Sequence, residues 1–349
     1  MRIIKYTNIL ILLMTLLSNA NYADAVDEKF LPKKIIFGSC LDQHLPEKIW
    51  DPIFSEKADL FLFMGDNIYL DSEDPLEKKE AYRIQMNMPW YAKLFKESKV
   101  IGTWDDHDYG LNDSGNEYIH KKESQNLFLE FIQEPKNSER WNRNGVYWSI
   151  IYGKKPNRIQ FILLDTRYFR SPLKTGWKWF FKTKYVPDYD KSKTMLGEEQ
   201  WKWLESELKK EAEVRILVSS IQFLFDDHEF ERWGNFPLER ERMFSLIKSS
   251  GANGLIIFSG DRHYSEISRL TENVNYPLYE ITESALNRPL EYDDGLDNKY
   301  RISSYYKKAN YGKMEIDWAG KDTKLKFSIH DIDGKKIMGH DINLTEITK

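Results

Sequence analysis

Six short apolar runs recur along the chain, and each of them ends in polar residues. The runs have the length of buried strands and are rich in β-branched or aromatic residues. They read KKIIFGSC, DLFLFMGDN, KVIGTWDDHD, RIQFILLDTR, VRILVSSIQF and GLIIFSGDRH. We therefore predict six core strands that end at polar side chains.

Helical patterns lie between several of these runs. Residues 197–210 place tryptophan and leucine on one face, and residues 237–250 begin with a proline and stop before Gly251. Strands that alternate with helices indicate an α/β fold. Near the C-terminus, residues 323–344 alternate with period two around an Asp-Gly pair, which predicts a hairpin.

The first 25 residues have the three-part layout of a secretory signal. Two basic residues precede an apolar run (ILILLMTLL), and small residues with an Ala-x-Ala pattern follow it. The apolar run is too short to span a bilayer. We predict a signal peptide over residues 1–25 and export to the periplasm or the medium, with an uncleaved interfacial anchor as the alternative.

The composition is that of a folded protein. Of 349 residues, 41% are hydrophobic and 14% aromatic, which excludes a disordered chain. The formal net charge of -4 argues against nucleic acid as a structural partner. Because repeats and linkers are absent from the sequence, we predict one catalytic domain over residues 26–349.

The strand ends are the places where open α/β sheets bind ligands. Turns also favour aspartate, so any one such position is uninformative by itself. Six polar strand ends in one chain favour a functional site, and one of them carries the chain's single cysteine. The six end residues are Cys40, Asp66, Asp106, Asp165, Gln222 and Asp261.

The motif GDNIY places Asp66 at a strand end and Tyr69 three residues later. A carboxylate in this position can bridge two cations. A phenolate is a rarer ligand that suits a hard trivalent metal. The alternative is a turn aspartate followed by a packed tyrosine.

The motif TWDDHDYG surrounds His107 with three carboxylates, those of Asp105, Asp106 and Asp108. Carboxylates so close together cannot all stay ionised without a cation or protons. His107 beside a metal would be a good general acid. The alternative is a solvated acidic loop with a surface histidine.

Two further motifs carry candidate chemistry. In SGDRHYSE, Asp261 and His263 are two residues apart, so in extended backbone both side chains point the same way. In LLDTRYFR, Arg167 follows a strand and offers a planar fork that matches phosphate oxygens. The alternatives are a turn aspartate with an ordinary histidine, and a salt-bridge arginine.

Taken in order, seven motifs resemble those of the PhoD-like alkaline phosphatase family of metallophosphoesterases. They are FGSC, GDNIY, TWDDHD, LDTRYFR, LGEEQWKWLESEL, SSIQF and SGDRHYSE. The resemblance implies a four-layer αββα sandwich with metals at the strand ends. Asp108 departs from the family pattern, in which glutamate is commoner.

The resemblance also implies a set of site residues. The expected ligands of a first metal, ferric iron, are Cys40, Asp66, Tyr69 and His263. Those of a second metal, calcium or another divalent cation, are Asp66, Asp106 and Asp261. Gln222 stands where related phosphoesterases place a histidine ligand. His107 matches the acid beside a metal ligand, and Arg167 matches a substrate-side arginine.

We expect an exported, metal-dependent hydrolase of phosphomonoesters or phosphodiesters, in which a metal-activated water attacks phosphorus and His107 is the general acid. The expected substrates are small phosphoesters, or diesters of phospholipids or nucleotides. Residues 174–193 contain six lysines and six aromatic residues, which suits peripheral contact with an anionic membrane or a nucleotide. The alternative is a loop that folds over the core with its lysines in water.

Three other functions are alternatives to this prediction. A phospholipase-type phosphodiesterase is a narrower form of the same chemistry, and an inactive exported metal-binding protein would keep the scaffold without turnover. A serine esterase of the SGNH type needs a serine after the Gly-Asp element and a late Asp-x-x-His. Here Asn67 follows Asp66, and the late pair is Asp261-x-His263, so the serine esterase is disfavoured.

Overall fold

The computed structural model of this protein describes residues 25–178, 181–290 and 297–349. The predicted signal peptide lies outside these residues, except for Ala25. Within the described ranges, no helix is both long enough and apolar enough to cross a membrane.

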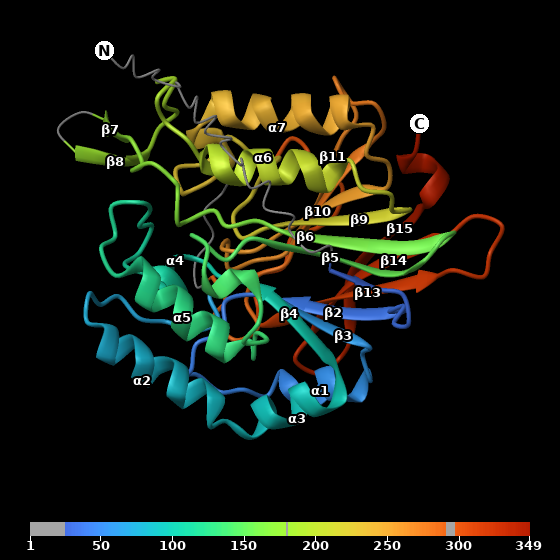
Figure 1. The fold of residues 1–349 in the computed structure, drawn as a ribbon, viewed down its shortest axis with the longest axis horizontal. Coiled ribbons are helices and arrows are strands. Elements are labelled where there is room, and N and C mark those ends of the chain that lie inside the picture. The colour runs from blue at the N-terminus through green and yellow to red at the C-terminus, as the bar shows by residue number, and fades with distance from the viewer. Residues whose placement is uncertain (1–24, 179–180, 291–296) are drawn as a thin grey trace, which may run out of the picture.

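Two mixed β-sheets form the centre of the molecule (Figure 1). In the first sheet the strand order is β1-β5-β6-β9-β10-β12-β11, and in the second it is β15-β14-β13-β2-β3-β4. The first sheet consists of β1 (Val26–Asp27), β5 (Trp148–Lys154), β6 (Asn157–Leu163), β9 (Val214–Ser219), β10 (Leu255–Ser259), β11 (Glu266–Leu270) and β12 (Leu278–Thr282). The second consists of β2 (Lys34–Gly38), β3 (Leu60–Met64), β4 (Lys99–Thr103), β13 (Asn310–Asp317), β14 (Lys324–Asp331) and β15 (Lys336–Asn343).

Helices cover the outer face of each sheet (Figure 1). The helices over the first sheet are α6 (Gly197–Leu208) and α7 (Pro237–Ser250). Those over the second are α1 (Trp50–Ser55), α2 (Pro75–Met86), α3 (Pro89–Glu97) and α5 (Lys121–Phe131). The predicted four-layer αββα sandwich is therefore confirmed.

Apolar side chains hold the layers together. Between the sheets, the rings of Phe37 on β2 and Phe258 on β10 lie 4.3 Å apart, centroid to centroid. Beneath the second sheet, Trp50 and Trp90 stack at 4.2 Å. Each such buried side chain contributes about 1.5–3 kcal/mol relative to exposure in water, so both interfaces stabilise the fold.

The sequence patterns explain most of these elements. All six predicted core strands form, as β2, β3, β4, β6, β9 and β10. Helix α7 begins at Pro237 and is ended by Gly251, whose φ of 71° is left-handed. The predicted hairpin is β14–β15, with Gly334 at φ 76° in its turn.

Parallel pairing sets the position of the strand ends. Strand β3 pairs in parallel with β2 and β4, and β9 pairs in parallel with β6 and β10. Within each sheet, the carboxyl ends of these strands therefore share one edge. A small hairpin, β7 (Thr175–Lys178) and β8 (Phe181–Tyr185), projects from the loop after β6.

Candidate metal centre

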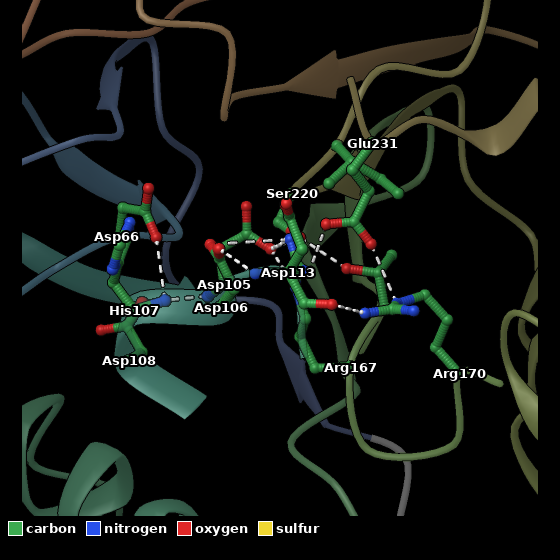
Figure 2. A network of polar contacts seen from close by, with 12 residues as sticks. Asp66, Asp105, Asp106, His107, Asp108, Asp113, Arg167, Arg170, Ser220 and Glu231 are labelled. Atoms are coloured by element: carbon green, nitrogen blue, oxygen red, sulfur yellow. Dashed lines mark hydrogen bonds and ion pairs between the residues drawn. The ribbon is translucent and has the colours of Figure 1, made fainter. Parts of the chain in front are cut away.

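Loops that follow strands of both sheets meet at one edge of the sandwich (Figure 2). After β2 and β3, backbone bonds pair the two loops, since Cys40 N donates to Gly65 O and Leu41 N to Asp66 O. From the other sheet, Ser220 Oγ after β9 donates to Asp105 Oδ1 at 2.7 Å. The fold thus gathers the predicted strand-end residues in one place.

Four of the predicted ligands have left-handed backbone. The φ values are 56° at Cys40, 53° at Asp66, 67° at Asp261 and 56° at His263. Only a few per cent of non-glycine residues adopt this conformation, which costs about 1–2 kcal/mol per residue. Strain of this kind collects at functional sites, so the backbone itself marks these four positions.

Two carboxylate-rich groups have ligand atoms that all lie within 4.8 Å of one another. One consists of Asp66, Asp106 and His107, and the other of Asp105, Asp106 and Asp261. Asp106 belongs to both groups. Two adjacent cations could therefore share it.

The donor atoms of the carboxylate groups fit a cation. Asp105 Oδ2 and Asp106 Oδ1 are buried and lack a hydrogen-bond donor among the described residues. Burial and the charge of Asp106 raise the pKa of Asp66 well above its ordinary value, and they raise that of Asp261 to about 7. Such a cluster holds more negative charge than its surroundings neutralise, and a bound metal removes this excess.

A thiol and a phenol border the first group. Tyr69 Oη donates to Asp66 Oδ2 at 2.8 Å, and Cys40 Sγ lies 3.6 Å from the same oxygen. Burial raises the pKa of the Cys40 thiol to about 12 and holds that of Tyr69 well above its ordinary value. Both groups therefore keep their protons unless a metal ion displaces them.

His263 is oriented through its backbone and one ring nitrogen. Its Nδ1 is 2.6 Å from the carbonyl oxygen of Arg288, so Nδ1 carries the proton and Nε2 is the nitrogen able to bind a metal. Its backbone N–H donates to Ser284 Oγ at 2.7 Å. The same hydroxyl lies 2.9 Å from Cys40 Sγ, so Ser284 links two predicted ligands.

His107 lies at the edge of the first group, on the short helix α4 (Asp106–Tyr109). Its backbone N–H donates to Asp66 Oδ1 at 3.4 Å, and its Nδ1 lies 3.2 Å from Asp71 Oδ1. Burial opposes the charged form of the imidazole. The carboxylates of Asp106, Asp66 and Asp71 outweigh burial and raise the pKa of His107 to about 10.

Arg167 is fully buried within a network of carboxylates (Figure 2). Its Nε donates to Asp105 Oδ1 at 2.5 Å, and its Nη1 pairs with Glu231. Arg170 Nε lies 2.9 Å from the other oxygen of Glu231, and its Nη2 donates to the carbonyl of Asp113. The Asp113 N–H in turn donates to Asp106 Oδ2 at 2.7 Å, which ties this network to the metal centre.

Three other predicted or noted residues form hydrogen bonds with groups other than the side chains of the clustered aspartates. The Gln222 amide nitrogen donates to Glu266 and Thr282, and its amide oxygen is buried and has no hydrogen-bond donor among the described residues. Asp165 accepts three backbone N–H groups and shapes the turn after β6. Asp108 is buried and accepts from Asn67, Asp105 and Tyr82, so it fixes the loop.

Several residues at the site were not predicted as ligands from the sequence. Asp105 was noted in TWDDHD but was not assigned as a ligand. Ser284 and Arg288 follow strand β12, an apolar run (PLYEIT) that also ends in polar residues and would have been found by the same criterion. Glu231 lies in a loop without a motif, so no sequence signal identifies it.

A family model and a curated relative match this chain. The family model for PhoD-like phosphatase matches residues 37–324. Alkaline phosphatase D of Bacillus subtilis (strain 168) is 24% identical over 282 residues, which are 67% of this chain and 46% of that protein. The chain thus spans about half the length of this curated relative.

Two solved structures share the fold. A structure of PhoD superposes with a TM-score of 0.69 and 19% identity, over 90% of this chain and 73% of that one. GAP50, the anchor in the inner membrane complex of Plasmodium, superposes with a TM-score of 0.55 and 13% identity, over 92% and 90%. At these identities the structural similarity shows the fold alone.

Proposed function

The chain belongs to the PhoD-like phosphatase family, and from this premise we propose that it is an exported, metal-dependent phosphoester hydrolase. The observation that carries the proposal is the pair of carboxylate groups joined by Asp106. Two-metal sites of phosphatases hold their ions about 3.5–4 Å apart, a spacing that calls for a shared ligand.

The residues divide between two metal positions. We propose Cys40, Tyr69 and His263 with Asp66 for a first metal, because a thiolate, a phenolate and an imidazole together suit ferric iron. We propose that Asp66 is shared with a second metal, whose other ligands are Asp106 and Asp261 with Asp105 beside them, because an all-carboxylate set suits calcium or another hard divalent cation. Gln222 stays a prediction, and its unpartnered amide oxygen is the atom that would bind a metal. When bound, such metals supply Lewis acidity that neutralises phosphate oxygens and activates water.

We propose that His107 donates a proton to the leaving oxygen of the ester. Its Nδ1 faces Asp71, which leaves Nε2 to hold the proton that is transferred. Its ring lies 4.4 Å from that of Tyr69, so the acid stands directly beside the predicted first metal position. General acids of this kind contribute typically about 10²–10⁴-fold to a rate.

We assign Arg167 a positioning role in place of the expected contact with substrate. The guanidinium is enclosed by Asp105 and Glu231 and has no exposed surface. It orients Asp105 beside the second metal position.

The hairpin β7–β8 is proposed to border the substrate site. Tyr185 at the end of β8 donates to Asp113 Oδ2 at 2.7 Å, and Asp113 contacts Asp106. This connection places the base of the lysine-rich segment 174–193 beside the metal centre. An anionic membrane or a nucleotide remains the proposed partner of this segment.

The proposal is tested with the purified protein and a panel of phosphomonoesters, phosphodiesters and phospholipids, with iron and calcium content measured in the same samples. We expect turnover of at least one ester class and its loss on chelation. Bound metal with no turnover of any class would instead support the non-catalytic metal-binding protein.

A further inference from the structure

Arg167 cannot reach a substrate at the proposed metal centre. Its guanidinium is sealed between Asp105 and Glu231 with no exposed surface. Lys78 is also buried, and its ammonium group donates to the carbonyls of His107 and Gly110. Neither cation is free to bind a phosphate that enters from solvent.

Arg288 lies at the rim of the same centre. Its guanidinium carbon is 4.1 Å from the centroid of the Tyr69 ring, so the cation stacks on a predicted metal ligand. The rings of His107 and His263 lie 4.4 and 6.1 Å from the same Tyr69 ring, centroid to centroid. The side chain of Arg288 is 43% exposed, so solvent and solutes reach it.

The contacts of Arg288 leave donors unused. Its Nη1 pairs with Asp42, the one carboxylate that it contacts in the part of the chain described. Guanidinium carries five N–H donors in a rigid fork, and a single carboxylate contact uses few of them. The fork is held in place by Asp42 and Tyr69 and keeps free donors at the rim.

We infer that Arg288 binds a non-bridging oxygen of the substrate phosphoryl group, an inference that rests on the proposed hydrolase function. Its backbone supports the same role. The Arg288 carbonyl accepts the His263 Nδ1 proton, and Leu290 N–H donates to the His263 carbonyl at 2.8 Å. Arg288 therefore orients His263 through its backbone carbonyl and places its own guanidinium beside Tyr69.

The charge of Arg288 distinguishes phosphomonoesters from phosphodiesters. A phosphomonoester carries up to two negative charges near neutral pH, whereas a diester carries one. A partly desolvated guanidinium interacts more strongly with the doubly charged group. Arg288 therefore favours monoesters over diesters.

The test measures inorganic phosphate binding to the metal-containing protein by calorimetry, alongside the kinetics. We expect Arg288→Gln to weaken phosphate binding at least about tenfold, because a charge-assisted hydrogen bond is lost. It should raise KM for monoesters more than for diesters. Arg288→Lys should recover part of both losses, and Asp42→Asn should tighten phosphate by freeing the fork. Arg242→Gln, at an exposed pair with Glu198 on helix α6, is the matched control.

Metal content and phosphate affinity together distinguish phosphate binding by Arg288 from a purely structural role. Every variant keeps the backbone carbonyl that His263 contacts, so metal content should stay at the wild-type level. Loss of metal in Arg288→Gln, or unchanged phosphate affinity with full metal, overturns the inference. Because phosphate binding is read without turnover, a wild-type protein that binds phosphate through Arg288 but hydrolyses no ester contradicts the hydrolase proposal alone.

Discussion

The carboxylates at the edge of the sandwich fall into two groups that differ in what neutralises them. Asp105 and Glu231, the arginine-paired carboxylates, are held by Arg167. Asp66 and Asp261, the arginine-free carboxylates, have no arginine or lysine ion pair among the described residues. Both groups lie at strand ends or in nearby loops and are largely removed from solvent.

The difference shows that residue type and position do not decide the role of an acidic side chain in this fold. Where a guanidinium already supplies positive charge, it neutralises the carboxylate and fixes its orientation, as Arg167 does for Asp105. Where it does not, the remaining negative charge can be balanced by a metal. The following experiments test this division.

The largest effect is expected for Asp66→Asn. Removing the ligand proposed to be shared should lower phosphoester hydrolysis at least about a thousandfold, because metal ions contribute several kcal/mol to such reactions. The metal-free variant should be no less stable than the metal-free wild type, since it loses a carboxylate that repels Asp106. Elemental analysis and urea unfolding check both expectations, with Glu198→Gln as the control. A variant that keeps its metals and its rate contradicts the division.

Arg167→Met should instead destabilise the fold. It removes the only arginine that pairs with Asp105 among the described residues and leaves Glu231 with Arg170 alone, which costs about 3–5 kcal/mol in the free energy of unfolding. The control Arg242→Met breaks an exposed pair and should cost about 1 kcal/mol or less. Equal losses for the two variants in urea unfolding would mean that the buried network contributes no more than a surface pair.

A smaller effect is expected for Ser284→Ala. The hydroxyl contacts Cys40 Sγ and accepts the His263 N–H, so its loss should weaken the first metal about 10–100-fold. A shift in the visible thiolate-to-iron absorption band should accompany the weaker binding. Ser249→Ala on helix α7 is the control, and an unshifted band with unchanged affinity argues against Cys40 as a ligand.

The smallest effect is expected in the pH dependence of stability, through His228, which lies near Arg262 and Arg232. Burial, together with Arg262 and Arg232, holds the pKa of His228 well below its ordinary value, so the folded protein keeps it neutral. The unfolded chain binds a proton below about pH 6.5. The free energy of unfolding should therefore fall as pH drops below this value, by at most about 1.4 kcal/mol per pH unit from this residue.

The variant His228→Asn isolates this contribution. An asparagine oxygen can replace the imidazole Nδ1, which accepts the Phe230 N–H at 3.2 Å, but it does not titrate. Urea unfolding between pH 5 and 7 should show a shallower pH dependence than in the wild type. Parallel curves for the two proteins would show that the pKa of His228 is the same in the folded and unfolded states.

The strands and the metal centre were predictable to different degrees. Apolar runs with polar ends identify β2, β3 and β4 and their terminal residues, because burial and turn chemistry are local properties of the sequence. The partners of Arg167 were not predictable, since Asp105 and Glu231 are 62 and 64 residues away and only the fold brings them together. The partners of the Gln222 amide nitrogen were not predictable for the same reason, because Glu266 and Thr282 come from other strands.

The left-handed backbone at Cys40 has a consequence for how this site can change. Aspartate and asparagine tolerate this conformation better than most residues do, so Cys40→Asp meets a loop already suited to the new side chain. At the proposed first metal position, one residue exchange can thus replace the proposed sulfur ligand by an oxygen ligand without rebuilding the loop. Metal preference can then diverge between descendants of this chain while the sandwich that carries it stays the same.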